Sequence, residues 1–147
     1  MVDDIRAKYP NDVKVVIKNF PLGSHKQANK AALYALAAHR QDKYKEMYDK
    51  IFANYRELRN NEDLPVQYAV ELGLDIEQFK RDAEDPALQD LIRRETQELR
   101  QTGMRLAVPK FLINGKEPAK RDMDTWTQLI DGYLKEEIGR ASCRERV

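Results

Sequence analysis

Two short apolar runs, far apart in the sequence, most constrain how this chain can fold. Residues 13–20 read Val-Lys-Val-Val-Ile-Lys-Asn-Phe, and residues 108–113 read Val-Pro-Lys-Phe-Leu-Ile. Runs of this length that are rich in β-branched and aromatic residues favour strands. The second run leads into Asn114-Gly115, a dipeptide typical of the tight turn of a β-hairpin. The sequence therefore predicts one largely buried strand early in the chain and a β-hairpin over residues 108–120.

The long segment between the two runs has the pattern of several amphipathic helices. Its apolar residues recur at spacings of three and four, which places them on one face of a helix. Residues that commonly begin or end helices punctuate the segment. They are Ser24, Asp42, Pro65, Asp75 and Asp85 at predicted starts, and Gly73 and Gly103 at predicted stops. A final helix is expected to begin at Asp122 or Asp124 and to turn Trp126 inward, so the predicted order is strand, helices, hairpin, helix.

Length and charge exclude several classes of protein. The chain has 147 residues, which suggests a single domain, and its formal net charge is +1. It has no basic stripe with interleaved aromatic residues, so we expect no nucleic-acid partner. No apolar run approaches the roughly 18 residues that a membrane span needs. The first ten residues lack the charged-then-apolar layout of a signal peptide.

The single cysteine, Cys143, lies in a segment that looks foreign to the domain. Residues 137–147 match the translation of a common sequencing adapter, and they show no helical or strand period. We therefore expect the last helix to end near Glu137 and residues 138–147 to be a non-native, adapter-like tail. Without that tail the chain has no cysteine, and Met1 can equally be an internal methionine of a longer protein.

The order of predicted elements resembles the thioredoxin fold after its first strand and helix. Residues 15–22, residues 31–52 and residues 108–116 carry the resemblance, which is to DsbA-like thiol–disulfide oxidoreductases. It implies an α/β (α+β-like) thioredoxin fold with an all-helical insertion over about residues 24–103. It also implies that the first strand and most of the first helix are missing, so that residues 1–137 form a partial domain.

The resemblance assigns a substrate-binding role to Val108 and Pro109. In this family these two residues would face a C-x-x-C pair, with a cis peptide bond before the proline, and would orient the backbone of a substrate. The pair would lie shortly before Met1, so no residue here maps to the catalytic nucleophile, and no metal or cofactor is expected. An ordinary trans-proline that opens a strand is the alternative reading of Pro109.

The family likeness also implies a function and a setting for the parent protein. It would exchange dithiols and disulfides with protein or peptide substrates in the periplasm or cell envelope, and several branches work with a membrane redox partner. A redox-inactive, peptide-binding thioredoxin-like module is the alternative. Loss of the strand beside residues 13–20 would expose an apolar edge, so we expect this chain alone to be helical but only marginally stable.

The remaining candidate site residues have simpler structural explanations. His25 and His39 are the only histidines, too few for a metal site, and a histidine near a helix C-terminus is favourable in itself. Aromatic residues at helical spacing are most often core, and carboxylates at helix starts are most often caps. We therefore expect the aromatic residues to be core and the carboxylates to be caps: Tyr34, Tyr44, Tyr48 and Tyr55 in the first class, Glu62-Asp63 and Asp82 to Asp85 in the second. The basic pairs Arg93-Arg94 and Lys120-Arg121 are expected to be solvated surface.

Overall fold

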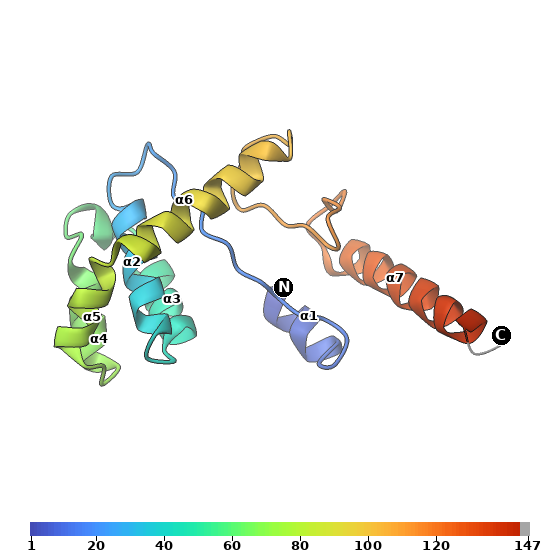
Figure 1. Ribbon diagram of the computed structural model, residues 1–147, viewed down its shortest axis with the longest axis horizontal. Helices are drawn as coiled ribbons and strands as arrows, with labels where there is room; N and C mark the ends of the chain where they lie inside the picture. The colour runs from blue at the N-terminus through green and yellow to red at the C-terminus, as the bar shows by residue number, and fades with distance from the viewer. Residues whose placement is uncertain (145–147) are drawn as a thin grey trace. The chain divides into compact units, whose positions relative to one another are not determined.

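The structure is a computed structural model that describes the backbone of residues 1–144 and the side chains of residues 1–136. The described residues form seven α-helices and one short 3-10 helix, and none of them lies in a strand (Figure 1). They divide into two compact units. Unit 1 combines Met1–Ile17 with the chain from Ala107 onwards, and unit 2 is the continuous segment Lys18–Leu106.

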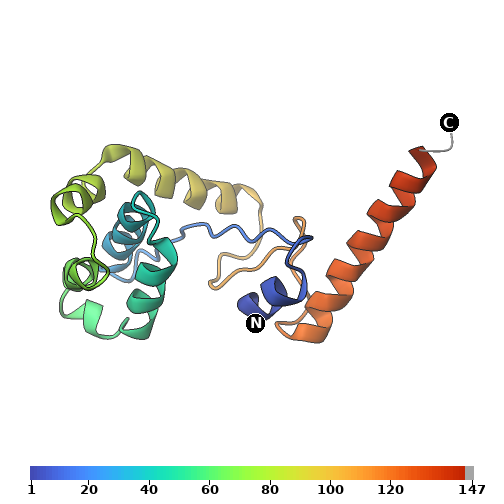
Figure 2. The ribbon, with the colours of Figure 1, turned by 90° about the horizontal axis from the view of Figure 1, so that it is seen from below.

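Unit 2 is a bundle of short helices gathered around α2. The central helix contacts four others, α3, α4, α5 and α6, and the same grouping is visible from a second direction in Figure 2. In chain order the elements are α2 (Ala28–His39), α3 (Tyr44–Ala53), η1 (Glu57–Arg59), α4 (Leu64–Glu71), α5 (Ile76–Ala83) and α6 (Pro86–Gln101).

The core of unit 2 combines small residues on α2 with large side chains from its neighbours. Ala37 and Ala38 are fully buried, and their small side chains let the neighbouring helices approach closely. Phe79 and Met47 are also fully buried, and the ring of Phe79 stacks on Tyr34 with centroids 5.4 Å apart. Full burial of a phenylalanine or methionine side chain contributes about 1.5–3 kcal/mol, so these contacts are major sources of stability.

Side-chain hydrogen bonds confirm two of the predicted helix starts. Oδ1 of Asp75 accepts a 2.8 Å hydrogen bond from the backbone three residues later, and Oδ1 of Asp85 accepts one of 2.8 Å from the backbone two residues later. Both bonds satisfy donors that the first turn of a helix leaves unpaired. The predicted stops at Gly73 and Gly103 are confirmed by left-handed φ angles of 70° and 69°.

The helix starts predicted at Ser24 and Asp42 are wrong. A backbone hydrogen bond of 2.9 Å from His25 to Leu22 closes a turn around Ser24, so α2 begins only afterwards. Asp42 has a left-handed φ of 58°, and the N-cap of α3 is the next residue. An N-cap normally has an extended backbone, which explains why the Asp42 side chain does not cap this helix.

Unit 1 packs α1 (Val2–Lys8) against α7 (Met123–Arg144). Their shared core is made by four buried residues, with Phe111, Ile113 and other partly buried side chains packed against them. The four are Ile5, Tyr9, Trp126 and Ile130.

The predicted end of the last helix at Glu137 is wrong, because α7 continues to Arg144. The added residues include alanine and arginine, which are strong helix formers, and no proline follows to stop the helix. The side chains of the predicted tail, residues 138–147, and with them Cys143, lie outside the described residues.

The predicted strands, and with them the predicted α/β class, are absent from the described residues. Asn114 and Gly115 both have positive φ angles, as a two-residue hairpin turn requires. The pairing on either side of this turn is limited to a single bridge between Ile113 and Lys116. No backbone–backbone hydrogen bond in the described chain involves residues 14–18. An extended segment becomes a strand only when a neighbour pairs with it, and the segment has no such neighbour here.

Helix α7 is the longest helix, yet it carries many charged residues. Among residues 1–144, no helix is both long enough and apolar enough to cross a membrane.

Candidate functional site

The loop that carries Val108 and Pro109 lies in unit 1 and presents apolar side chains to solvent. The peptide bond between these two residues is cis. Val108 is 40% exposed and Leu112 is 41% exposed. Phe111 points the other way and packs on Trp126, with ring centroids 4.8 Å apart. The loop is therefore anchored on the core of unit 1 by one aromatic side chain, while Val108 and Leu112 remain accessible.

A nearly buried lysine follows the proline and braces the hairpin turn. The side chain of Lys110 is only 8% exposed, and its Nζ lies 2.7 Å from Oε2 of Glu117. The two residues flank the turn on opposite sides, so their ion pair closes it. Arg121 lies over the face of Phe111 at 5.7 Å, which adds a second cation to this corner of the unit.

The start of α7 is tied to the same corner. The indole Nε1 of Trp126 donates a 3.2 Å hydrogen bond to the backbone oxygen of Lys120. Oδ1 of Asp122 accepts a 2.7 Å hydrogen bond from the backbone N–H of Thr125, as the predicted cap requires. Hydrogen bonds from Thr125 hold the pKa of Asp122 below its ordinary value. These contacts fix the loop between the turn and the last helix.

No described residue supplies redox or metal chemistry at this corner. The sequence has one cysteine, Cys143, and its side chain lies outside the described residues. Within the described part, no group of three or more His, Cys, Asp or Glu residues could hold a metal ion. His39 ends α2 and meets the ring of Tyr44 edge-on, with centroids 6.0 Å apart, as expected of a structural histidine.

The tyrosines and carboxylates of unit 2 have mainly structural contacts. Asp63 accepts a 2.6 Å hydrogen bond from the Tyr34 hydroxyl and lies 2.7 Å from Nζ of Lys30. Lys30, and then Tyr34, lower the pKa of Asp63. Burial raises the pKa of Tyr44 to about 12. Tyr55 differs from the expectation that the tyrosines are core, because it is 56% exposed.

Asp82 and Asp85 hold the C-terminal end of α2. Both carboxylates bind the guanidinium of Arg40, with N–O distances of 2.6 Å and 2.5 Å respectively. The hydrogen bonds that Arg40 donates, the one to Asp85 most strongly, raise the pKa of Arg40. The acidic residues around the start of α6 are therefore used in caps and ion pairs.

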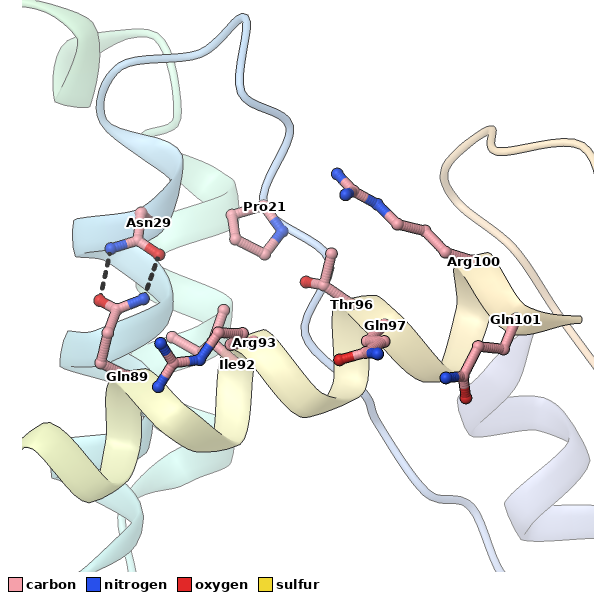
Figure 3. Close-up of a pocket in the computed structure, with 9 residues that line it drawn as sticks. All are labelled: Pro21, Asn29, Gln89, Ile92, Arg93, Thr96, Gln97, Arg100 and Gln101. Carbon is pink, nitrogen blue, oxygen red and sulfur yellow. Dashed lines mark hydrogen bonds between the residues drawn. The ribbon is translucent and has the colours of Figure 1, made fainter.

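A groove lies within unit 2, and sequence reasoning missed it. It is a groove of about 540 Å³ along α6, facing the start of α2 and the segment that carries Pro21 (Figure 3). Arg93, which we expected to be solvated surface, lines this groove together with Arg100. The groove and the Val108–Pro109 loop belong to different units.

Comparisons with known proteins identify the family of the chain. A family model described as "Thioredoxin" matches residues 1–132. The Na(+)/H(+) antiporter NhaA 1 of Mycobacterium sp. (strain KMS) is 32% identical over 118 residues, which are 78% of this chain and 19% of the relative. The Na(+)/H(+) antiporter NhaA of Herminiimonas arsenicoxydans is 32% identical over 114 residues, 78% of this chain and 18% of the relative.

The chain spans about a fifth of the length of these curated relatives. No solved structure matches it. The described residues are all helical, so the family assignment rests on the sequence match over residues 1–132 and not on the architecture. As its resemblance to DsbA-like domains predicts, the chain belongs to the thioredoxin family.

Proposed function

We propose that the protein from which this chain comes is a thiol–disulfide oxidoreductase that acts on protein substrates. The observation that carries the proposal is the thioredoxin-family match over residues 1–132. The exposure of Val108 supports it, because a substrate can reach that residue. The redox cysteines would lie in a part of the protein that precedes this sequence, since residues 1–142 contain none.

The proposed reaction is a two-step exchange that balances in electrons. A cysteine thiolate of the enzyme attacks one sulfur of a substrate disulfide, and the other substrate sulfur leaves as a thiolate. The second enzyme cysteine then attacks the mixed disulfide, which releases the reduced substrate and leaves the enzyme oxidised. The reverse sequence oxidises a substrate dithiol. In either direction Val108 and Pro109 would bind the substrate backbone, and neither would take part in electron transfer.

The same family supports a setting outside the cytoplasm, where disulfides persist. The relatives named above are Na(+)/H(+) antiporters in which the matched segment is a small part, which favours a parent protein that works beside or within a membrane protein. A membrane redox partner is the corresponding proposal for electron supply.

A second candidate function is a redox-inactive module that binds peptides. The observation that favours it is the absence of any cysteine pair from the sequence, which has one cysteine in total. In that case the Val108–Pro109 loop would bind an extended peptide without chemistry.

The deciding experiment is to read the codons that precede Met1 in the source DNA and to express the resulting open frame. The oxidoreductase proposal predicts a C-x-x-C motif within about two helical turns of Met1 and reduction of insulin disulfides by the purified protein. Replacing the first cysteine with serine should abolish that activity. A stop codon and a ribosome-binding site immediately before Met1 would overturn the enzyme proposal and leave the peptide-binding module.

A further inference from the structure

The groove of unit 2 is lined by hydrogen-bond donors and by no carboxylate. Its nine lining residues comprise two arginines, four side-chain amides, a threonine, and the apolar residues Pro21 and Ile92 (Figure 3). The chain as a whole has 25 aspartates and glutamates, so their absence from this surface is notable. A surface of this composition is complementary to an anion.

The two arginines differ in how far their charge is already neutralised. Arg93 forms an ion pair with Asp90, one turn earlier on α6. Arg100 forms no ion pair with any of the residues whose side chains the structure describes. In Figure 3 its side chain projects from α6 on the side where Pro21 lies. The charge of Arg100 is therefore available to a ligand, and that of Arg93 is partly compensated.

Two further carboxylates of α6, those of Glu95 and Glu98, bind the chain segment that precedes α2. Oε2 of Glu95 accepts hydrogen bonds of 2.6 Å and 2.9 Å from the backbone and side chain of Asn19. Glu98 forms an ion pair with Lys18. These contacts hold the incoming chain against α6 and keep both carboxylates out of the groove lining.

The side-chain amides of the groove can form hydrogen bonds with a peptide backbone. Nδ2 of Asn29 donates to Oε1 of Gln89 at 2.9 Å, and Nε2 of Gln89 donates back at 3.3 Å, so this pair forms a fixed wall between α2 and α6. Gln97 and Gln101 make no hydrogen bond with another described residue, so their amide groups can both donate and accept. Ile92, which is 2% exposed, forms an apolar floor.

The spacing of the arginines selects the form of the ligand. Arg93 and Arg100 are seven positions apart on one helix, which corresponds to a rise of about 10 Å. A polyproline II peptide has three residues per turn and a rise of about 3.1 Å per residue. Its side chains at positions i and i+3 therefore lie on the same side, about 9 Å apart. Two acidic side chains at that spacing would reach both guanidinium groups.

We propose that this groove binds an extended acidic peptide of the pattern Glu-x-x-Glu, with Arg100 and Arg93 on its carboxylates and with Thr96 and Gln97, which lie between the arginines on α6, beside the residues between the two glutamates. The proposal goes beyond the oxidoreductase function, because it requires no redox cysteine and lies entirely in unit 2. Its success or failure therefore leaves the proposed reaction untouched.

The test is fluorescence anisotropy of the full chain with a labelled peptide, Gly-Glu-Pro-Leu-Glu-Gly, at low salt. We expect saturable binding that weakens as salt is raised, and no binding of the matched peptide in which both glutamates are glutamines. Arg100→Gln should weaken binding about fivefold, the scale of one solvent-accessible charge pair. Asp90→Asn should strengthen it about twofold, because it frees Arg93.

The matched control is Arg81→Gln, which removes an exposed arginine of α5 outside the groove and should leave the affinity unchanged. Circular dichroism of each variant checks that its helices are intact. Equal binding of the glutamine peptide, or equal effects of Arg100→Gln and Arg81→Gln, would overturn the proposal. Displacement of the peptide by an equal concentration of inorganic phosphate would also overturn it, because the groove would then be a simple anion site.

Discussion

The hydroxyl of Tyr34 donates a 2.6 Å hydrogen bond to Oδ1 of Asp63, while the ring of the same tyrosine stacks on Phe79. One side chain thus joins a surface ion pair to the centre of unit 2. Burial, and then the hydrogen bond to Asp63, raise the pKa of Tyr34 above its ordinary value of 10.0. The neutral phenol is therefore the form that the folded unit stabilises.

Replacing Tyr34 by phenylalanine should remove this hydrogen bond and its pH dependence. We expect a loss of about 1 kcal/mol at pH 8. A group whose folded pKa is raised contributes stability that is complete below its unfolded pKa and is lost as the pH rises through the folded pKa. Wild type should therefore lose more stability than Tyr34→Phe above pH 10, and the gap between them should shrink. Urea unfolding followed by circular dichroism at pH 8 and pH 11 measures both effects.

Tyr55→Phe is the matched control for that experiment, because Tyr55 is 56% exposed. It should change stability little at either pH. A constant difference between wild type and Tyr34→Phe across the alkaline range would contradict the role assigned to the Tyr34 hydroxyl.

Replacing Phe79 by alanine should destabilise unit 2 severely. The side chain is fully buried, and truncation of a buried phenylalanine costs about 3–5 kcal/mol because it leaves a cavity. Phe52→Ala removes a side chain of the same kind that is 59% exposed, and it should cost less than about 1 kcal/mol. Thermal unfolding monitored by circular dichroism compares the two. Similar losses for both variants would show that the core is packed differently.

Removing the Asp85 side chain, which caps α6, should lower the stability of unit 2 most at pH values where the Asp85 carboxyl group is ionised. The backbone N–H of Ala87, and then Arg40, hold the pKa of Asp85 below its ordinary value of 3.8. A lowered folded pKa contributes stability that is present above the unfolded pKa and disappears as the pH falls through the folded pKa. Asp85→Ala should therefore lower the Tm by a few degrees at pH 7 and by less in strong acid.

Asp49→Ala is the control for the cap, since Asp49 forms an exposed pair with Lys45 within α3. Its Tm should remain close to that of wild type at both pH values. If Asp85→Ala lowered the Tm equally at pH 7 and in strong acid, the ionised carboxylate would not be the source of the stability.

The unpaired apolar segment of unit 1 should make the chain self-associate. Val16 is 63% exposed. Neither Val16 nor any other residue of the segment 14–18 forms a backbone–backbone hydrogen bond in the described chain. Exposed apolar strands without a partner are sites of aggregation. Val16→Lys should raise the monomer fraction in sedimentation velocity without loss of helix. Val13→Lys should instead unfold unit 1, because Val13 packs on its core. If Val16→Lys and wild type had the same monomer fraction, this prediction would be wrong.

Features that depend on neighbouring residues in the sequence were predictable, and those that depend on distant partners were not. The caps at Asp75 and Asp85 use backbone groups two or three residues away, and the stops at Gly73 and Gly103 need only a permissive backbone. Their residue types therefore carry the information directly.

Residues 13–20 have the composition of a strand, but a strand exists only through pairing with another chain segment. Composition cannot report whether that segment is present, which is why the described residues form no strand although the chain belongs to the thioredoxin family. The groove was missed for a related reason. Its charge balance depends on which face of α6 holds Glu95 and Glu98, and their partners Asn19 and Lys18 are far away in the sequence.

The division into units also sets an order of events during protein synthesis. Unit 2 is one uninterrupted stretch, Lys18–Leu106, whereas unit 1 joins the first residues of the chain to the last. On a ribosome, α2 to α6 can assemble as soon as they have emerged, because the contacts of α2 with α3, α4, α5 and α6 lie within that stretch. Val2–Lys8 must wait, with Ile5 and Tyr9 uncovered, until Trp126 and Ile130 have been translated. The residues of α1 are thus translated before unit 2 but buried after it.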